Sequence, residues 1–498
     1  MMMEHDLPTK NLERQLNEMA LVAGRKRQSK QTGFIHLYHD EQEEFQHTIP
    51  FAENTWFILA LLRAKTSEHM NEARDLLDRL LHFQSKDDGN FPIYLHEYPR
   101  CRDRFAGVQL LPAFYLILVE FSQVVGSELK QRLVDASKAL MRLILNASEE
   151  KPPSYALSIQ IGALAKVFGR YFGETHMEEQ GEAQLNQLLS LGLQRAWLIP
   201  TSIAEICLAL QLAYEQIQSS PWKLFWNHIR ASWHQSTATY VGPGMRQFQQ
   251  GEQPQVTLYD LYLGYFSQQL SPRVLNDAPF HLQAVLIRPT GETLQSLALP
   301  YRLDGEVDGS PWSIFQADTY AFSWIDKTAL QHVAQDHAFH PLSLVWGDHE
   351  QVHSFVCQGG NYQSIDFKSG ENFIDFIVNL APEFKVEDRE KCRELSFFFD
   401  VESEIKMTIQ GETASTFDLS EEFILETPQM QLLLEVTLQK GQGQFLGHVM
   451  RGNRPSQILL KGGNRYKSYD WHLFFRTLRR SEDAQLKVRL KLKPCKND

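Results

Sequence analysis

Residues 105–121 read FAGVQLLPAFYLILVEF, a run that is apolar on almost every side. Such a run predicts a helix enclosed by other helices, with Pro112 either kinking it or lying in its first turns. The helices expected on either side of it, at 70–83 and 128–147, are each apolar on one stripe only. Enclosed and one-sided helices therefore alternate along this part of the chain.

The alternation continues to about residue 270. Further helices are expected at 154–172, 182–193, 201–217 and 221–234, separated by prolines and glycines. Successive helical hairpins with an inner and an outer member indicate an α/α toroid or an α-solenoid. Because the sequence shows no repeat of fixed period, the toroid is favoured.

Beyond Pro272 the helical period gives way to short alternating segments. In the last of them Leu486, Val488, Leu490 and Leu492 alternate with lysines and an arginine, as in a strand with one buried face. Similar segments are found at 281–287, 314–325, 373–380, 395–400, 404–409, 431–438 and 444–450. Their number and the turn residues between them indicate an antiparallel β-sandwich.

The predicted fold is therefore an α+β multidomain protein. An all-α toroid occupies residues 1–270, and an all-β antiparallel sandwich occupies 280–498. At 498 residues with 43% hydrophobic side chains, the chain has enough apolar material for two separate cores. The junction holds two prolines and an Asn-Asp pair, which suit a linker.

Composition excludes several functional classes. The formal net charge of -12 argues against a general nucleic-acid-binding surface. No apolar run approaches the ~18 residues of a membrane span, and residues 1–10 lack the apolar core of a secretory signal, so we expect a cytoplasmic protein that does not bind membranes. The five cysteines are scattered and lack CxxC spacing, which indicates neither a disulfide framework nor a zinc knuckle.

The loop between the first two helices of this pattern carries the densest group of reactive side chains. Residues 84–105 read QSKDDGNFPIYLHEYPRCRDRF. Its first half is explained by structure, because the turn Asp88-Gly89-Asn90 stops the preceding helix and Pro92 keeps the exit extended. The second half is the first candidate site.

This half has the residue types of acid–base chemistry. An imidazole, a carboxylate and a phenol at His96, Glu97 and Tyr98 suit a base, a charge neutraliser and an acid. Arg100 and Arg102 suit the binding of a substrate carboxylate through paired hydrogen bonds. In an extended segment His96 and Tyr98 would share one side, and Glu97 would face the other.

Two further positions join the candidate list. The sequence Gly-Pro-Gly at 242–244 interrupts the last hairpins of the toroid and brings Tyr240 and Arg246 into a loop. Asn54 lies at the start of an enclosed helix, where it is either a capping residue or a ligand for substrate. No cofactor is expected.

A metal site is considered and not favoured. His349 and His353 fit the spacing of the pattern His-Glu-x-x-His, which binds zinc when both histidines lie on one face of a helix. The residues that follow have the pattern of a strand, so the helical context is missing.

A helical toroid followed by an antiparallel β-domain resembles the polysaccharide lyases of the chondroitin/hyaluronan and heparinase II/III-like families. The resemblance implies cleavage of uronic-acid polymers by β-elimination, with an acidic oligosaccharide or polysaccharide as the partner. Transferred to this sequence, it assigns the acid/base role to Tyr240 or Tyr98, the partner base to His96, carboxylate neutralisation to Asn54 or Glu97, and a subsite cation to Arg246.

Two other functions stay open at this point. Glycoside hydrolysis also occurs on α/α toroids and needs two facing carboxyl groups about 5 to 9.5 Å apart. Glu53, Asp87, Asp88, Glu97 and Asp103 supply candidates for such a pair. The third function is non-catalytic binding of a glycan or a protein.

Overall fold

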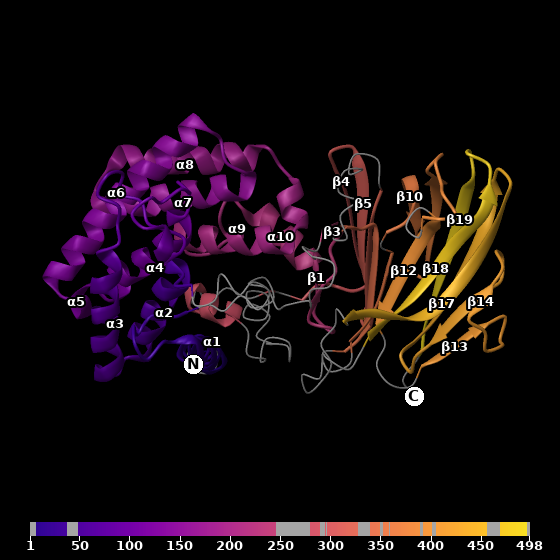
Figure 1. The fold of residues 1–498 in the computed structure, drawn as a ribbon, viewed down its shortest axis with the longest axis horizontal. Coiled ribbons are helices and arrows are strands. Elements are labelled where there is room, and N and C mark those ends of the chain that lie inside the picture. The colour runs from indigo at the N-terminus through magenta and orange to yellow at the C-terminus, as the bar shows by residue number, and fades with distance from the viewer. Residues whose placement is uncertain are drawn as a thin grey trace.

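The computed structural model describes residues 6–36, 48–245, 279–288, 294, 296–326, 339–348, 352–357, 359–388, 392–400, 405–455 and 469–495. The helices form one body and most of the strands form a second body beside it (Figure 1). The predicted class, an α/α toroid followed by an antiparallel β-sandwich, is confirmed. The bounds 1–270 and 280–498 stay a prediction; α10 (Lys223–Ala231) is the last α-helix that the structure describes, and the large sheet begins at Tyr301.

The toroid consists of hairpins with an inner and an outer helix. The inner helices are buried on almost every side: α2 (Phe51–Ala64), α4 (Gly107–Glu120), α7 (Tyr155–Phe172) and α9 (Pro200–Ala213). The outer helices are α3 (Ser67–Leu81), α6 (Ser127–Glu150) and α8 (Thr175–Ser190), which bury one face each. The inner helices contact one another in chain order, and the short helix α5 (Ser122–Val125) links α4 to α6. This is the alternation that the sequence predicts.

A helical segment after the toroid links its first and last inner helices. The 3₁₀ segment η4 (Pro279–Leu286) packs against α2 and against the N-terminal helix α1 (Asp6–Arg27). Arg63 at the end of α2 donates to the carbonyl of Val285, and the Gln211 side chain of α9 donates to the carbonyl of Arg288 at 3.3 Å. The prediction of a strand at 281–287 is therefore wrong. The apolar residues of this segment are buried on several sides between helices. A continuous apolar run of this kind does not distinguish a helix from a strand.

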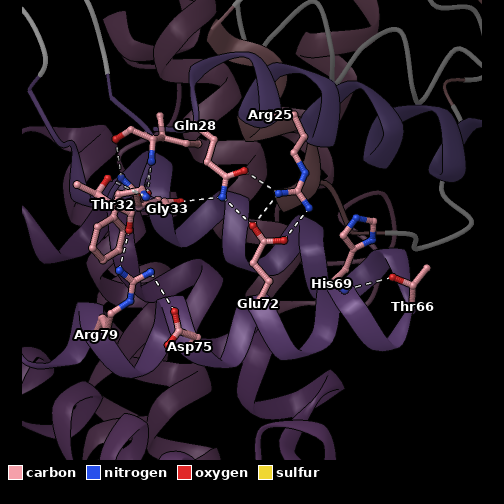
Figure 2. A network of polar contacts seen from close by, with 12 residues as sticks. Arg25, Gln28, Thr32, Gly33, Thr66, His69, Glu72, Asp75 and Arg79 are labelled. Carbon is pink, nitrogen blue, oxygen red and sulfur yellow. Dashed lines mark hydrogen bonds and ion pairs between the residues drawn. The ribbon is translucent and has the colours of Figure 1, made fainter. Parts of the chain in front are cut away.

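The N-terminal helix is fixed to the outer helix α3 by a polar network (Figure 2). Arg25 makes a bidentate ion pair with Glu72, with both nitrogen–oxygen distances at 2.6 Å, and Gln28 donates to the same carboxylate at 2.7 Å. Burial acts to raise the pKa of Glu72, but these hydrogen bonds outweigh it and the pKa is lowered. The turn that follows is anchored by Arg79, which donates to the carbonyl of Thr32 at 2.7 Å.

The predicted helix stop at residues 88–90 is wrong, because α3 ends at Leu81 and its C-cap is His82. Residues 85–90 form a separate turn: Gly89 has a positive φ of 77°, and its N–H donates to the carbonyl of Ser85 at 3.0 Å. The N–H of Asn90 donates to the Asp88 carboxylate at 3.0 Å. This turn lies after the end of α3 and directs the chain into the candidate loop.

Replacing Gly89 by alanine is expected to lower the free energy of unfolding by at least about 1 to 2 kcal/mol, the cost of a left-handed residue with a side chain. A Cβ atom at this position would also lie 2.8 Å from the Cβ of Ala139. Gly173→Ala is the matched control, because Gly173 has a φ of +70 but no atom within 4 Å of the new Cβ. Urea denaturation should show the larger loss for Gly89→Ala, and equal losses would contradict the predicted clash.

The β-domain is a sandwich of two antiparallel sheets. The larger sheet has the order β14-β17-β18-β12-β9-β8-β6-β5-β4 and the smaller has β10-β11-β19-β16-β15-β13. The larger sheet comprises β4 (Tyr301–Val307), β5 (Ser310–Gln316), β6 (Tyr320–Ile325), β8 (Leu342–Gly347), β9 (Val352–Cys357), β12 (Arg393–Asp400), β14 (Thr416–Phe417), β17 (Gly443–Pro455) and β18 (Tyr469–Arg480). The smaller comprises β10 (Tyr362–Ser369), β11 (Phe373–Leu380), β13 (Lys406–Ile409), β15 (Phe423–Glu426), β16 (Met430–Lys440) and β19 (Gln485–Pro494).

The sheets meet over one apolar core. Leu486, Val488, Leu490 and Leu492 of β19 are all buried in it, as their alternation predicts. Outside the sandwich, two short strand pairs follow the toroid: β1 (Trp233–His234) with β2 (Thr239–Tyr240), and β3 (Gly244–Met245) with β7 (Phe339–His340).

A fully buried ion pair lies at the edge of this core. The side chains of Glu394 and Arg480 are both 0% exposed, and their closest nitrogen–oxygen distance is 2.6 Å. Thr477 also donates to the Glu394 carboxylate, and a second Arg480 nitrogen donates to the carbonyl of Ala381. Burial raises the pKa of Glu394, and the hydrogen bonds from Arg480 and Thr477 counter that rise. The pair is thus held by several bonds inside the domain.

The toroid and the β-domain share an interface. An apolar cluster joins Leu198, Ala231 and Val241 of the first body to Val307, Trp312, Ile314, Ala321, Ile325 and Val345 of the second. The Gln316 side chain donates to the carbonyl of Ala231 at 2.6 Å, and Arg195 of η3 (Arg195–Leu198) pairs with Asp308. The contacts position the β-domain against one end of the toroid.

A buried histidine at this interface makes stability depend on pH. The imidazole Nε2 of His228 donates a hydrogen bond at 2.8 Å to the carbonyl of Trp197, and its ring lies 5.6 Å from that of Trp312. Burial lowers the pKa of His228 to about 4. The unfolded chain binds the proton at about pH 6.5, so stability is complete above that pH and falls as the pH drops toward 4.

The expected loss from His228 between pH 6.5 and 4 is about 3 kcal/mol, the free energy that corresponds to this pKa difference. Denaturant titrations at both pH values measure it. His228→Gln should flatten the pH dependence, whereas His176→Gln at an exposed site should leave it unchanged. An unchanged slope in His228→Gln would contradict the assignment.

Candidate active site

Connecting segments lead into three of the inner helices: 82–106 before α4, 151–154 before α7 and 191–199 before α9. The inner helices α2, α4 and α7 each pack against an outer helix that follows them in the chain. The β-domain contacts the segment before α9 through Leu198 and Arg195. The candidate loop is the segment before α4.

The loop is bound to the start of α2. The N–H of Phe51 donates to the carbonyl of Ile93, and the N–H of Leu95 donates to the carbonyl of Ile49, both at 3.0 Å. Residues 93–95 thus run antiparallel to 49–51. This pairing places Tyr94 beside the first turn of α2.

The loop is not extended at His96, so the predicted alternation of sides is wrong. Leu95–Glu97 forms one turn of 3₁₀ helix, η2. The turn returns the Glu97 carboxylate to the N–H of Ile93 at 3.3 Å, because three residues of 3₁₀ helix complete one turn. The ring of His96 stacks on Tyr94, with centroids 5.8 Å apart and planes at 7°, whereas Tyr98 packs edge-on against Phe83 at 5.6 Å.

Three ionisable groups act on one another at this point. Glu53 in the first turn of α2 is partly buried, and this burial raises its pKa. The pKa of Tyr94 is raised by burial and then by the negative charges of Glu53 and Glu97. Tyr94 therefore keeps its proton at neutral pH, and Glu53 keeps its proton to a higher pH than an exposed carboxyl does.

Exposed cations follow on the C-terminal side of the turn. The side chains of Arg100 and Arg102 are both exposed, and the N–H of Arg100 donates to the carbonyl of Glu97 at 2.9 Å. Arg104 instead pairs with Glu150 at the end of α6. The Arg100 and Arg102 guanidinium groups are thus open to solvent, and their predicted role in binding a substrate carboxylate stays a prediction.

Asn54 has structural contacts. Its side chain is 1% exposed and donates to the carbonyls of Pro50 at 2.6 Å and Ile35 at 3.2 Å. It also accepts from the N–H of Ile35 at 2.8 Å. These bonds fix the turn before α2, and its predicted role toward substrate stays a prediction.

The second candidate loop has its own neighbours. Tyr240 is 6% exposed, and its hydroxyl lies within hydrogen-bond distance of the carbonyls of Leu198 at 3.1 Å and Pro243 at 3.2 Å. Its catalytic role also stays a prediction. Arg246 lies outside the described residues. The ring contacts of His96 and Tyr98 are to Tyr94 and Phe83.

Sequence reasoning did not single out Tyr94. The signal for it was its position two residues before His96 in the same loop. Glu53 was considered only as one of several carboxylates for hydrolysis, because its nearness to Tyr94 depends on pairing between segments some 40 residues apart. The structure brings these two residues together with His96 and Glu97.

His353 is the one histidine of the candidate metal pattern that the structure describes. His353 in β9 is buried and stacks on Trp346 at 5.4 Å, and burial lowers its pKa to about 4; His349 lies outside the described ranges. Among the described residues no group of three or more His, Cys, Asp or Glu is placed to hold a metal ion. In the same part of the chain, none of the helices combines the length and the apolar character needed to cross a bilayer.

Comparison with known proteins gives likeness only among solved structures. No family model matches the chain, and no curated protein matches its sequence. Heparinase III is 10% identical with a TM-score of 0.49, covering 98% of this chain and 85% of that one. The chondroitin AC lyase of Streptomyces coelicolor A3, in complex with chondroitin sulphate, is 8% identical with a TM-score of 0.47, covering 98% and 79%. A glycoside hydrolase is 10% identical with a TM-score of 0.30, covering 87% and 90%. These likenesses concern architecture alone.

Proposed function

We propose that this chain is a carbohydrate-active lyase that cleaves glycans containing uronic acids by β-elimination. The reaction site is the group formed by Glu53, Tyr94, His96 and Glu97. Arg100 and Arg102 bind acidic groups of the sugar chain beside it. The observation that carries this proposal is the stacking of His96 on the Tyr94 ring, whose phenol lies next to Glu53, a carboxyl with a pKa raised by burial.

Each residue type suits one part of an elimination. His96 is exposed and takes the proton from C5 of the uronate. Tyr94 is protonated before the reaction, and its phenol donates that proton to the oxygen that leaves C4. The C5–H and C4–O bonds break, a double bond forms between C4 and C5, and no water is consumed.

The carboxyl of Glu53 lowers the barrier to removal of the C5 proton. In its protonated form it donates a hydrogen bond to the substrate carboxylate, which gains negative charge as the proton departs. Such a bond strengthens as charge develops, so it stabilises the transition state more than the bound substrate. Glu97 is held by the N–H of Ile93 and keeps the phenol protonated through its negative charge.

A panel of uronic-acid glycans tests the proposal. Incubation of the purified chain with hyaluronan, chondroitin, heparan and bacterial uronate polymers should give new ultraviolet absorbance from an unsaturated uronate with at least one of them. The absence of that absorbance across the panel, with a protein shown to be folded, would sink the lyase proposal.

Glycoside hydrolysis is the second candidate, and one observation favours it. Glu53 and Glu97 both act on Tyr94, so two carboxyl groups lie on the same site. In a hydrolase one of them acts as acid and the other as base or nucleophile. The expected result is then release of reducing ends without the ultraviolet chromophore, and its loss in Glu97→Gln.

A further inference from the structure

A cavity lined by residues of both domains lies at their junction. It has a volume of about 190 Å³, room for several water molecules at about 30 Å³ each. Three parts of the chain line it: the end of α10 with β1 and the turn after it, Leu294 with residues 296–299, and the end of β5 with the turn to β6. In Figure 1 α10 and β1 mark this junction of the two bodies.

The floor of the cavity is fixed by hydrogen bonds that cross the domain boundary. The Gln316 side chain donates to the carbonyl of Ala231 at 2.6 Å. One ring nitrogen of His234 lies 3.0 Å from the carbonyl of Ala317, and the other lies 2.8 Å from the hydroxyl of Thr237. Burial lowers the pKa of His234, so this ring is neutral and leaves the charge of the cavity to other residues.

Arg230 supplies a positive charge with unused donors. Within the described residues its guanidinium makes one long hydrogen bond, to the carbonyl of Ser296 at 3.4 Å. Its Nε is buried and, among the described residues, has no hydrogen-bond partner. A buried donor atom without a partner is costly, so the Nε of Arg230 calls for a partner such as a water, an ion or a ligand. A carboxylate is the group whose geometry fits an arginine fork.

The remaining walls supply groups of other kinds. Asp318, Gln235 and Ser236 offer acceptors and donors for hydroxyl groups. Trp233 and Leu297 supply apolar surface. A ligand that satisfies all of them carries one carboxylate, several hydroxyls and an apolar face, which is the chemistry of a sugar acid.

We propose that this cavity binds a single hexuronate unit, with its carboxylate on Arg230 and its hydroxyls toward Asp318. The two residues belong to different domains, so the bound sugar acid bridges the toroid and the β-domain. The choice of a sugar acid rests on the proposed function, whereas the presence of a carboxylate site rests on Arg230 alone.

Calorimetry and thermal denaturation of the full chain test this proposal with glucuronate, glucose and acetate. Glucuronate should bind and raise Tm, with at least tenfold lower affinity for glucose and for acetate. Arg230→Gln should weaken glucuronate binding at least tenfold, and Arg230→Lys, which keeps the charge but loses the fork, should weaken it less. Arg142→Gln, at an exposed site, is the control and should bind as the wild type does.

A further variant distinguishes glucuronate binding in the cavity from the proposed reaction at the loop that carries His96. His96→Ala should bind glucuronate normally, so binding by a chain without lyase activity still supports the cavity. Three results would overturn the proposal: equal binding of acetate and glucuronate, loss of binding in His96→Ala, or unchanged binding in a folded Arg230→Gln. Asp318→Asn provides a second variant should Arg230→Gln not fold, and undiminished glucuronate affinity in Asp318→Asn would also contradict the proposed orientation.

Discussion

Replacing Arg480 by methionine is expected to lower the free energy of unfolding by about 3 to 5 kcal/mol, the cost of leaving one charge of a buried pair without its partner. The Glu394 carboxylate would remain inside the β-domain, where its side chain is 0% exposed. It would keep the hydrogen bond from Thr477 but lose its neutralising charge. Equilibrium denaturation in urea at pH 7 measures the loss.

Two further variants make this prediction specific. Arg489→Met removes an arginine that pairs with Asp375 at 41% and 24% side-chain exposure, and such an exposed pair contributes less than about 1 kcal/mol. The double replacement Glu394→Leu with Arg480→Met removes both buried charges and should be more stable than Arg480→Met alone. A loss in Arg480→Met no larger than in Arg489→Met would contradict the account of the buried pair.

The second large effect concerns the proposed reaction. On a substrate identified by the absorbance assay, His96→Ala and Tyr94→Phe should each lower kcat/KM by about 10² to 10⁴, the usual contribution of a positioned acid or base. Stability should change little in His96→Ala because this side chain is exposed. Initial rates at several substrate concentrations give kcat/KM for the wild type and for each variant.

The matched control for the phenol is Tyr98→Phe. Tyr98 lies four residues from Tyr94 in the same loop but packs against Phe83, so removal of its hydroxyl should leave kcat/KM within about twofold, below 1 kcal/mol. Equal losses in the two tyrosine variants would place the acid elsewhere. Full activity in His96→Ala would remove the proposed base.

The fold was predictable wherever the pattern of apolar residues shows which sides of a helix or strand are buried. The enclosed pattern of α4 and the alternation of β19 both report their surroundings directly. The strand predicted at 281–287 is instead the 3₁₀ segment η4, because a segment buried on several sides loses the contrast between faces that distinguishes helix from strand. The spacing of apolar residues therefore predicts the helices of the toroid and the strands of the sheets better than the segments that connect them.

The candidate site was only partly predictable. His96 and Glu97 stood out as reactive residue types in one loop, but their directions depend on a single 3₁₀ turn that no periodicity reveals. Glu53 joins them through backbone pairing of 49–51 with 93–95. Contacts of this kind between separate segments are set by the tertiary structure, so the sequence alone did not indicate Tyr94 as the stacking partner of His96.

The most direct test of β-elimination is the oxygen content of the products. The chain is incubated with its uronic-acid substrate in water labelled with heavy oxygen, and the fragments are weighed by mass spectrometry immediately. Elimination predicts an unsaturated fragment that is lighter by one water than its hydrolytic counterpart, and no label at the cleaved bond. Label incorporated there, with no unsaturated fragment, would contradict the proposed lyase reaction and favour hydrolysis.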